Sequence, residues 1–315
     1  MFIILSLLLM LYTDILIPHS PAKQQGGTAS CWAFSMCSYW ETEEAIANGD
    51  SIVSQELSPW YLARIKMEEN CQTMMSSGFR KPQKLPNGAM GQTAIKIREV
   101  HGIAGLSDYE VSDHGQGKNF RTMKRIMTML TWVGQYTILL RPLCQKMITW
   151  LLDSRWGKLP QSAIVQYQEF PTPVFYTSFS HLPYRQEVLL SLSDNYEQWP
   201  LMNQPLDSLI NIMIDTLQSG HSLLWQGSIR RGFSTKKGIA ILPTAIEISE
   251  QKRTDDYQNG LITDDHMMHI IGLAHDENGI RYFIAKNSVG DVGPYHGLVY
   301  MSENYIRLYT IAVGI

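Results

Sequence analysis

The sequence predicts an α+β protein in which helices come first and strands come last. Helical spacing of apolar residues recurs up to residue 219, and from residue 222 onward short apolar runs with β-branched residues dominate. A length of 315 residues suits one generous two-lobed unit or two small domains. We therefore expect a helical lobe from the N-terminal part of the chain and a β-rich lobe from the C-terminal part.

The expected helices begin at recognisable start signals. Ser30 is a suitable N-cap, and Pro59 suits the first turn of a helix. Helices are predicted over residues 30–47, 59–67, 91–101, 120–140 and 205–219. We interpret the stretch 120–140 as core-forming rather than cofactor-binding, and the Pro-, Gly- and Ser-containing segment 72–90 as a surface loop.

The expected strands lie in the last third of the chain. They cover residues 222–225, 238–242, 266–273, 281–286, 297–301 and 308–313. We divide the chain into a leader, 1–12, and one domain, 13–315. Within the domain, residues 13–112 form the helical lobe, 113–204 an insertion in that lobe, and 205–315 the β-rich lobe.

The leader is apolar from Phe2 to Tyr12, which is too short for a membrane span. It has the length of a signal-peptide core, although no Lys or Arg precedes it and no clear cleavage site follows. We interpret it as an export signal, which favours a periplasmic or secreted protein over a cytoplasmic one. The alternatives are a buried N-terminal strand and an incomplete gene start.

Composition excludes several functional classes. A formal charge of −3 and a pI near 6.3, without a basic cluster, give no reason to expect nucleic acid as a partner. The sequence has no Gly-rich phosphate loop, no CxxC pair and no HExxH helix, so neither a metal nor an organic cofactor is expected. A homo-oligomer stays open.

Cys31 is the candidate nucleophile. It stands at the start of a predicted helix, where the positive end of the helix dipole favours thiolate over thiol. Gln25 lies six residues upstream, and its amide, together with the Cys31 N–H, could bind an oxyanion on an attacked carbonyl. The other three cysteines, Cys37, Cys71 and Cys144, cannot all pair, so we expect no disulfide framework.

A thiolate of this kind needs a base and a residue that orients the base. His266 begins the predicted strand 266–273, and Asn287 directly follows the predicted strand 281–286. His269 is the competing base. Three residues further along a strand, it points to the opposite face, so we assign the base to His266 and a structural role to His269.

The run Gln-Gly-Gly-Thr-Ala-Ser-Cys-Trp-Ala-Phe-Ser, residues 25–35, resembles the nucleophile segment of papain-like cysteine peptidases. His266 and Asn287 fall on the His and Asn motifs of that family, and the order along the chain is the same. The resemblance implies a two-lobe fold with a helical lobe and a β-barrel-like lobe. It also implies a peptide substrate, with Cys31 as nucleophile, His266 as base, Asn287 as orienting residue and Gln25 in the oxyanion site.

The resemblance further assigns substrate binding to Gly91, Met90, Trp32 and Asp265. Gly91 and Met90 take the place of the family's paired glycines. Two departures stand out. Val289 replaces the Trp that normally shields the Asn–His hydrogen bond, and Thr28 stands where many secreted relatives carry a disulfide cysteine.

Within the family, the chain looks like the bleomycin hydrolase and aminopeptidase C branch. The insertion, the lack of a disulfide framework and the lack of a long propeptide indicate this branch. Similar stretches lie at residues 177–181, 225–234, 263–266 and 305–311. Known members release N-terminal residues because a C-terminal tail lies in the cleft.

This chain ends at Ile315, directly after its last predicted strand, so the insertion 113–204 could block the cleft instead. We favour an aminopeptidase over an open-cleft endopeptidase. The rival classes are a peptide-binding homologue without catalysis, which Val289 suggests, and an acyl transferase or amidase that uses the same residues.

Overall fold

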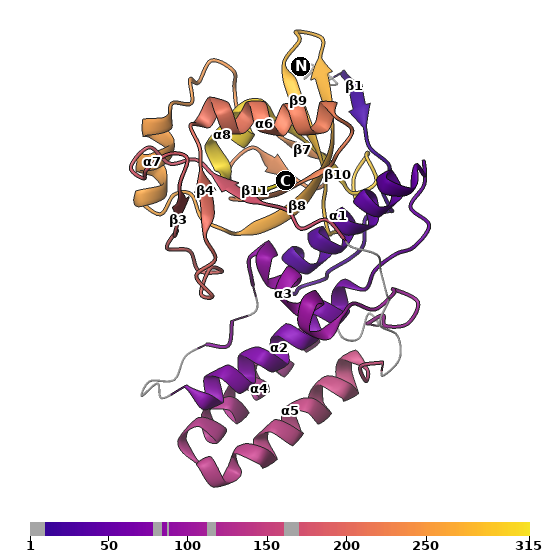
Figure 1. Ribbon diagram of the computed structural model, residues 1–315, viewed down its shortest axis with the longest axis vertical. Coiled ribbons are helices and arrows are strands. Elements are labelled where there is room, and N and C mark those ends of the chain that lie inside the picture. The colour runs from indigo at the N-terminus through magenta and orange to yellow at the C-terminus, as the bar shows by residue number, and fades with distance from the viewer. Residues whose placement is uncertain (1–9, 78–83, 87, 112–117, 161–169) are drawn as a thin grey trace, which may run out of the picture.

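The chain folds into two lobes, one of helices and one built on a β-sheet (Figure 1). The computed structural model describes residues 10–77, 84–86, 88–111, 118–160 and 170–315. The α+β two-lobe architecture expected from the sequence is confirmed. In the described residues, no helix combines the length and the apolar character that crossing a membrane requires.

Five α-helices build the helical lobe. They are α1 (Cys31–Asn48), α2 (Pro59–Ser76), α3 (Gly91–His101), α4 (Lys118–Tyr136) and α5 (Arg141–Trp156). The 3₁₀ turn η2 (Ile138–Leu140) joins α4 to α5, and both helices pack against each other and against α2.

The second lobe is a mixed sheet with three helices. Its strands are β1 (Leu11–Leu16), β2 (Phe175–Thr177), β3 (Glu187–Val188), β4 (Leu201–Asn203), β5 (Leu223–Gly227), β6 (Phe233–Ser234), β7 (Ile239–Ala240), β8 (His266–Asp276), β9 (Arg281–Lys286), β10 (Leu298–Ser302) and β11 (Thr310–Gly314). The helices are α6 (Leu206–Gln218), α7 (Glu250–Gln258) and α8 (Glu303–Tyr309).

The strand order is β3-β4-β2-β11-β5-β8-β9-β10-β7-β6, and β1 pairs with β8 beside this path. The pairs β10–β7 and β2–β4 are parallel, and the other pairs are antiparallel. Among the described residues β3 and β6 end the sheet without pairing with each other. The β-rich lobe is therefore an open sheet, and the barrel-like closure that the resemblance implies is not formed there.

Local sequence signals explain where the first helices start. Ser58 accepts a hydrogen bond from the Tyr61 N–H at 3.2 Å, and Pro59 occupies the first turn of α2. At α1 the carbonyl of Ser30 accepts from the Phe34 N–H at 3.2 Å, but the Ser30 side chain makes no cap bond. The predicted position of Ser30 is therefore right, whereas its side-chain role is not.

Two predicted elements agree with the observed helices and strands at both ends. The helix 91–101 and the strand 281–286 are found end to end. The predicted loop 72–90 is wrong over its first residues because α2 continues to Ser76, and residues 78–83 and 87 lie outside the described residues. The predicted strand 308–313 is wrong at its start, since residues 308 and 309 complete α8.

The boundaries between lobes also need correction. Residues 13–16 belong to β1, which pairs with β8, so the helical lobe does not begin at residue 13. Within the segment 113–204, α4 and α5 do extend the helical lobe, but β2, β3 and β4 join the sheet. Only residues 11 and 12 of the proposed leader belong to β1, and this strand is mostly exposed rather than buried as the strand alternative expected, while residues 1–9 lie outside the described residues.

The helix α1 lies between the two lobes, against β8 of the sheet (Figure 1). Its residues are buried on nearly every side, because it packs on the other helices as well as on the sheet. Ser35 Oγ donates to the carbonyl of Met267 at 2.9 Å, and Ser38 Oγ bonds to His269 Nδ1 at 2.7 Å. These bonds fix α1 in register with the start of β8.

A buried carboxylate on α1 holds the segment that leads to it. Glu41 accepts hydrogen bonds from Ser20 Oγ and Lys23 Nζ, both at 2.5 Å, and from the Leu57 N–H at 2.6 Å. Lys286 Nζ, at the end of β9, donates to the Ser20 carbonyl and hydroxyl at 2.7 Å. One buried anion thus connects α1, the N-terminal segment and β9.

We expect Glu41→Gln to lower the free energy of unfolding by about 1.5–3 kcal/mol, because charged hydrogen bonds of a buried group are lost. Urea unfolding followed by circular dichroism measures the change. The control Glu99→Gln alters an exposed carboxylate on α3 and should have little effect. Equal stability of the two variants would contradict this role of Glu41.

Candidate functional site

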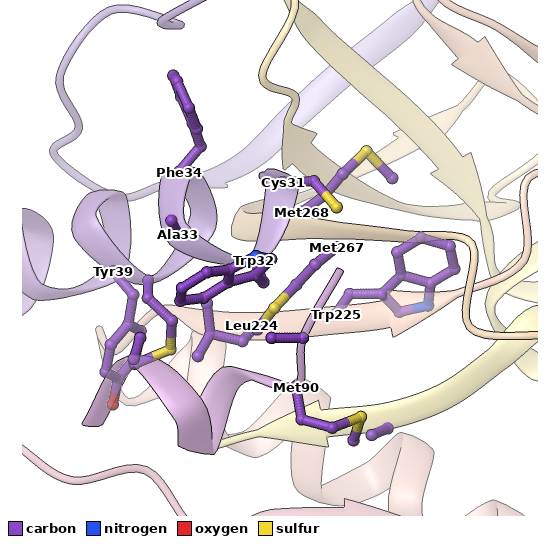
Figure 2. Packing of buried hydrophobic residues seen from close by; sticks show 14 of the residues in the cluster. Cys31, Trp32, Ala33, Phe34, Tyr39, Met90, Leu224, Trp225, Met267 and Met268 are labelled. Carbon is purple, nitrogen blue, oxygen red and sulfur yellow. The ribbon is translucent and has the colours of Figure 1, made fainter. Parts of the chain in front are cut away.

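Cys31 is the first residue of α1 and has 8% of its surface exposed. Figure 2 shows it among residues of the buried apolar cluster, which also contains Met267 and Met268. Cys37, Cys71 and Cys144 are buried, and all four cysteines are unpaired.

Burial raises the pKa of the Cys31 thiol to about 12, and the charge of Asp194 adds to the increase. Hydrogen bonds from backbone N–H groups, first that of Met267 and then those of Trp32 and Cys31, act in the opposite direction. Burial therefore disfavours the resting thiolate that the helix N-terminus would favour. Desolvation outweighs the helix N-terminus, so attack requires a base that removes the proton.

His266 and Asn287 meet at the ends of two paired strands. His266 is the first residue of β8, and Asn287 directly follows β9. His266 Nε2 lies 2.8 Å from Asn287 Oδ1, which also accepts from the Ser288 N–H at 2.8 Å. An amide oxygen only accepts, so Nε2 carries the proton and Nδ1 is left to take one.

Burial lowers the pKa of His266, while the bond to Asn287 and the charge of Asp265 raise it. The described residues contain no hydrogen bond between Cys31 and His266. The two are linked instead through Met267, which follows His266 directly and whose N–H reaches the Cys31 thiol. Catalytic hydrogen bonds are often long without substrate and tighten when it binds.

His269 has a different environment. It is fully buried, its Nδ1 bonds to Ser38 on α1, and its ring contacts Tyr39 edge-on. Burial lowers its pKa well below the usual value. This arrangement supports the choice of His266 as the base and a packing role for His269.

The side chain of Gln25 is held by hydrogen bonds to Ser288, after β9, and to Thr28, before α1. Its Oε1 accepts from Ser288 Oγ at 2.6 Å, and its Nε2 donates to the Thr28 carbonyl at 2.8 Å. Thr28 Oγ1 donates back to the Gln25 carbonyl at 2.8 Å. These hydrogen bonds anchor the loop at Thr28, the position where many secreted papain relatives carry a disulfide cysteine. One hydrogen of the Gln25 amide has no acceptor among the described residues and is available to an oxyanion.

The loop of Gln25 pairs with the loop that follows Asn287. The Gln25 N–H donates to the Ser288 carbonyl at 3.0 Å, and Gln24 Nε2 donates to the Val289 carbonyl at 2.8 Å. This pairing brings Gln25 and Asn287 together, although 261 residues lie between them. Val289 is half-buried at this junction.

Three of the four predicted substrate-binding residues are not arranged as expected, whereas Asp265 lines a cavity described below. Trp32 and Met90 are almost completely buried, and a Cβ on Gly91 would lie 2.6 Å from the ring of Phe175. These three residues therefore face the core. Asp265 is partly exposed, but it forms an ion pair with Arg230 and accepts from Thr263.

A segment that the sequence did not single out joins the lobes beside the site. We call residues 189–199 the strap. Ser193 Oγ and the Asp194 N–H donate to the two carboxylate oxygens of Asp264 at 2.9 and 2.7 Å. Asp264 stands two residues before His266, so this end of the strap is fixed to the sheet lobe.

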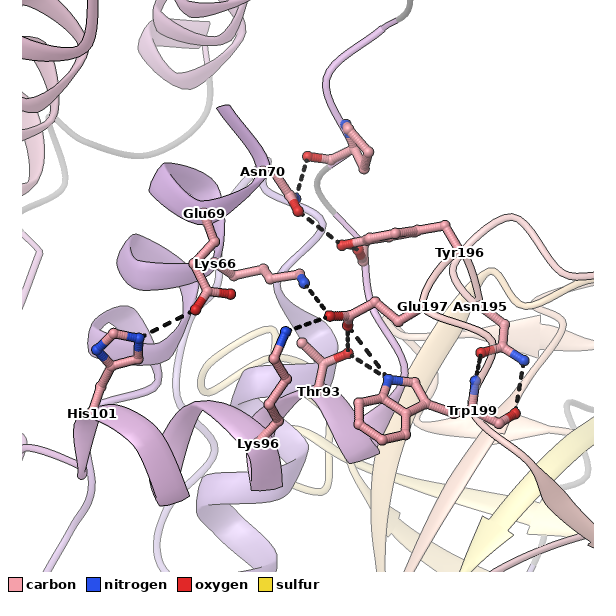
Figure 3. A network of polar contacts seen from close by, with 12 residues as sticks. Lys66, Glu69, Asn70, Thr93, Lys96, His101, Asn195, Tyr196, Glu197 and Trp199 are labelled. Carbon is pink, nitrogen blue, oxygen red and sulfur yellow. Dashed lines mark hydrogen bonds and ion pairs between the residues drawn. The ribbon is translucent and has the colours of Figure 1, made fainter. Parts of the chain in front are cut away.

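The other end of the strap is fixed to the helical lobe (Figure 3). Glu197 accepts from Lys66 on α2 and Lys96 on α3, both at 3.0 Å, and from Thr93 at 2.5 Å. Burial alone would raise the pKa of Glu197, but these three donors outweigh it and lower the pKa to about 2. Tyr196 adds a bond from its hydroxyl to Asn70 at 3.3 Å.

A cavity of about 500 Å³ opens beside the strap. It is lined by residues of the strap, of the end of α7 and of the approach to His266, namely Ser191, Leu192, Ser193, Tyr257, Gln258, Gly260, Ile262, Thr263, Asp264 and Asp265. The cavity is large enough for a substrate side chain.

No protein-family model and no curated protein matches this sequence. Solved protein structures, however, do match this chain. PepW from Lactobacillus rhamnosis HN001 aligns with a TM-score of 0.71 at 14% identity, over 96% of this chain and 81% of PepW. The chain has the papain-like two-lobe fold.

Two further structures align less closely. The proform of the Amb a 11 cysteine protease of ragweed pollen has a TM-score of 0.49 at 14% identity, over 96% of this chain and 66% of its own. The bromelain protease from Ananas comosus has a TM-score of 0.45 at 14% identity, over 94% and 92% of the two chains.

We predict that Val289→Trp raises the turnover number, because a larger side chain shields the bond between Asn287 and His266 from water. Steady-state kinetics on a fluorogenic peptide amide measures the effect, and Val289→Leu is the matched apolar control. A clear fall in turnover with an unchanged unfolding temperature would show that the junction is built around Val289, which contradicts this account.

Proposed function

We propose that this protein is a cysteine peptidase that hydrolyses peptide bonds through an acyl-enzyme on Cys31. The observation that carries the proposal is the 2.8 Å bond between His266 and Asn287, adjacent to a cysteine at a helix N-terminus. The likeness to PepW supports the fold in which these residues meet.

In the proposed reaction, Nδ1 of His266 takes the proton of Cys31 as the sulfur attacks the peptide carbonyl. Asn287 holds the imidazole through Nε2 and stabilises the imidazolium. Gln25 Nε2 and the Cys31 N–H donate to the oxyanion. His266 then protonates the leaving amine, and water hydrolyses the thioester with His266 again as base.

We further propose an aminopeptidase rather than an open-cleft endopeptidase. The sequence resemblance to the bleomycin hydrolase and aminopeptidase C branch supports this choice. The strap supports this choice, because it ties the lobes together beside Asp264, two residues before His266, where an extended peptide would have to pass it.

We expect a papain-type epoxide inhibitor to add one equivalent to Cys31 and none to Cys37, Cys71 or Cys144. Only Cys31 combines a helix N-terminus with a neighbouring base, and the other three are buried in the core. Mass spectrometry of the labelled peptides measures this.

Cys31→Ser should abolish hydrolysis, whereas Cys37→Ala should preserve it. His266→Ala should lower kcat/KM by about 10²–10⁴-fold. Absence of labelling together with unchanged peptide binding would instead indicate a non-catalytic peptide-binding protein.

The aminopeptidase proposal predicts faster cleavage of an unblocked aminoacyl fluorogenic amide than of the N-acylated dipeptide amide with the same scissile residue. The strap would hinder the additional acyl residue. Both rates are measured under the same conditions with active-site-titrated enzyme. If the N-acylated substrate is cleaved at least as fast, the endopeptidase alternative replaces this proposal.

A further inference from the structure

Asp194, at the centre of the strap, has its carboxylate packed against the backbone that precedes α3. Its backbone N–H is bonded to Asp264, and its side chain lies against Gly88. A Cβ added to Gly88 would lie 2.2 Å from each carboxylate oxygen of Asp194. The carboxylate therefore occupies the space that a side chain at residue 88 would need.

The neighbouring acids are already satisfied, whereas Asp194 is not. Asp264 accepts two hydrogen bonds from the strap, and Asp265 is paired with Arg230. The described residues offer no hydrogen-bond donor and no ion-pair partner to the carboxylate of Asp194. An anion that is partly buried and unpaired favours a positively charged ligand.

The charge of Asp194 reaches the nucleophile. It is among the causes that raise the pKa of the Cys31 thiol, and the Asp194 N–H bonds to Asp264, two residues before His266. Burial, followed by the charges of Asp264 and Asp265, raises the pKa of Asp194 itself to about 7, while Lys124 acts in the opposite direction. The carboxylate therefore titrates near neutral pH.

We propose that Asp194 is a specificity-determining residue that binds a cationic group of the peptide substrate, either its α-ammonium or a basic side chain. This inference rests on the proposed peptidase function and names the chemistry that its substrate must carry. The strap is anchored to both lobes, so the carboxylate is in place before the substrate arrives, and little entropy is lost on binding.

Binding of a cation would also affect the nucleophile. A positive charge beside Asp194 offsets the negative field that disfavours the Cys31 thiolate. The proton can then move from Cys31 to His266 more readily once a charged substrate is bound. A suitable substrate therefore contributes to activating the enzyme, and a neutral one does not.

The test compares kcat/KM for three fluorogenic amides with the same leucyl residue at the scissile bond. One has a free α-amine, one is N-acetylated, and one is extended by N-acetyl-arginine. Asp194→Asn should lower kcat/KM about tenfold or more on the free-amine substrate if the α-ammonium is bound, or on the arginyl substrate if a side chain is bound. The N-acetylated substrate should be unaffected.

Two further variants separate charge from structure. Gly88→Ala keeps the carboxylate but displaces it, so it should cause the same selective loss on the cationic substrate. Asp215→Asn removes an exposed carboxylate on α6 and should leave all three rates unchanged. Equal losses on all substrates, or no loss with Asp194→Asn, would overturn the proposal.

The pH dependence distinguishes the two sources of charge. Below pH 7 Asp194 is largely protonated, so KM for a cationic substrate should fall as pH rises through about 7. An α-ammonium loses its proton near pH 8, which gives an optimum between about pH 7 and 8. A guanidinium stays charged, and the improvement then persists above pH 8.

Binding to the Cys31→Ser protein makes the test independent of catalysis. Calorimetry with leucinamide, N-acetyl-leucinamide and N-acetyl-arginyl-leucinamide measures affinity directly, with and without Asp194→Asn. If the wild type hydrolyses none of the amides, the proposed peptidase function fails. The inference about Asp194 then stands or falls on whether its removal weakens binding of the cationic compounds selectively.

Discussion

The buried carboxylate of Glu41 is the interaction on which the arrangement of the site depends. Its side chain is buried, so it must be paired, and its partners come from the N-terminal segment and the loop before α2. Lys23 precedes Gln25 by two residues, and Lys286, which bonds to Ser20, directly precedes Asn287. The Glu41 carboxylate on α1 thus helps to position Gln25 and Asn287. Cys31 begins the same helix.

The strap is a second constraint, and it acts across the cleft rather than within a lobe. Its charged end is neutralised on the helical lobe by two lysines, and its other end is bonded to Asp264 on the sheet lobe. Only Asp194, between these anchors, keeps a carboxylate without a partner among the described residues. The chain therefore combines a papain-like fold with a strap that carries an unpaired acidic group between its two anchors.

Short motifs predicted where the candidate catalytic residues lie in the fold, because each motif depends on local structure. Cys31 at a helix start, His266 at a strand start and Asn287 after a strand are positions that periodicity and turn residues reveal. Substrate-facing residues were predicted poorly. Whether Met90 or Trp32 points to the cleft or to the core depends on how the loop and helix rotate against the sheet, and the motif alone contains no information on that rotation.

The sequence by itself determined the α+β class, the order of the elements and the identity of the four catalytic candidates. Those features depend on hydrophobic period and on neighbours a few residues apart. Tertiary structure alone decided the burial that raises the pKa of Cys31, the return of residues 175–203 to the sheet, and the position of Asp194 against Gly88. The physical reason is that desolvation and close backbone contact arise between segments about a hundred residues apart or more, and no local pattern encodes which segments meet.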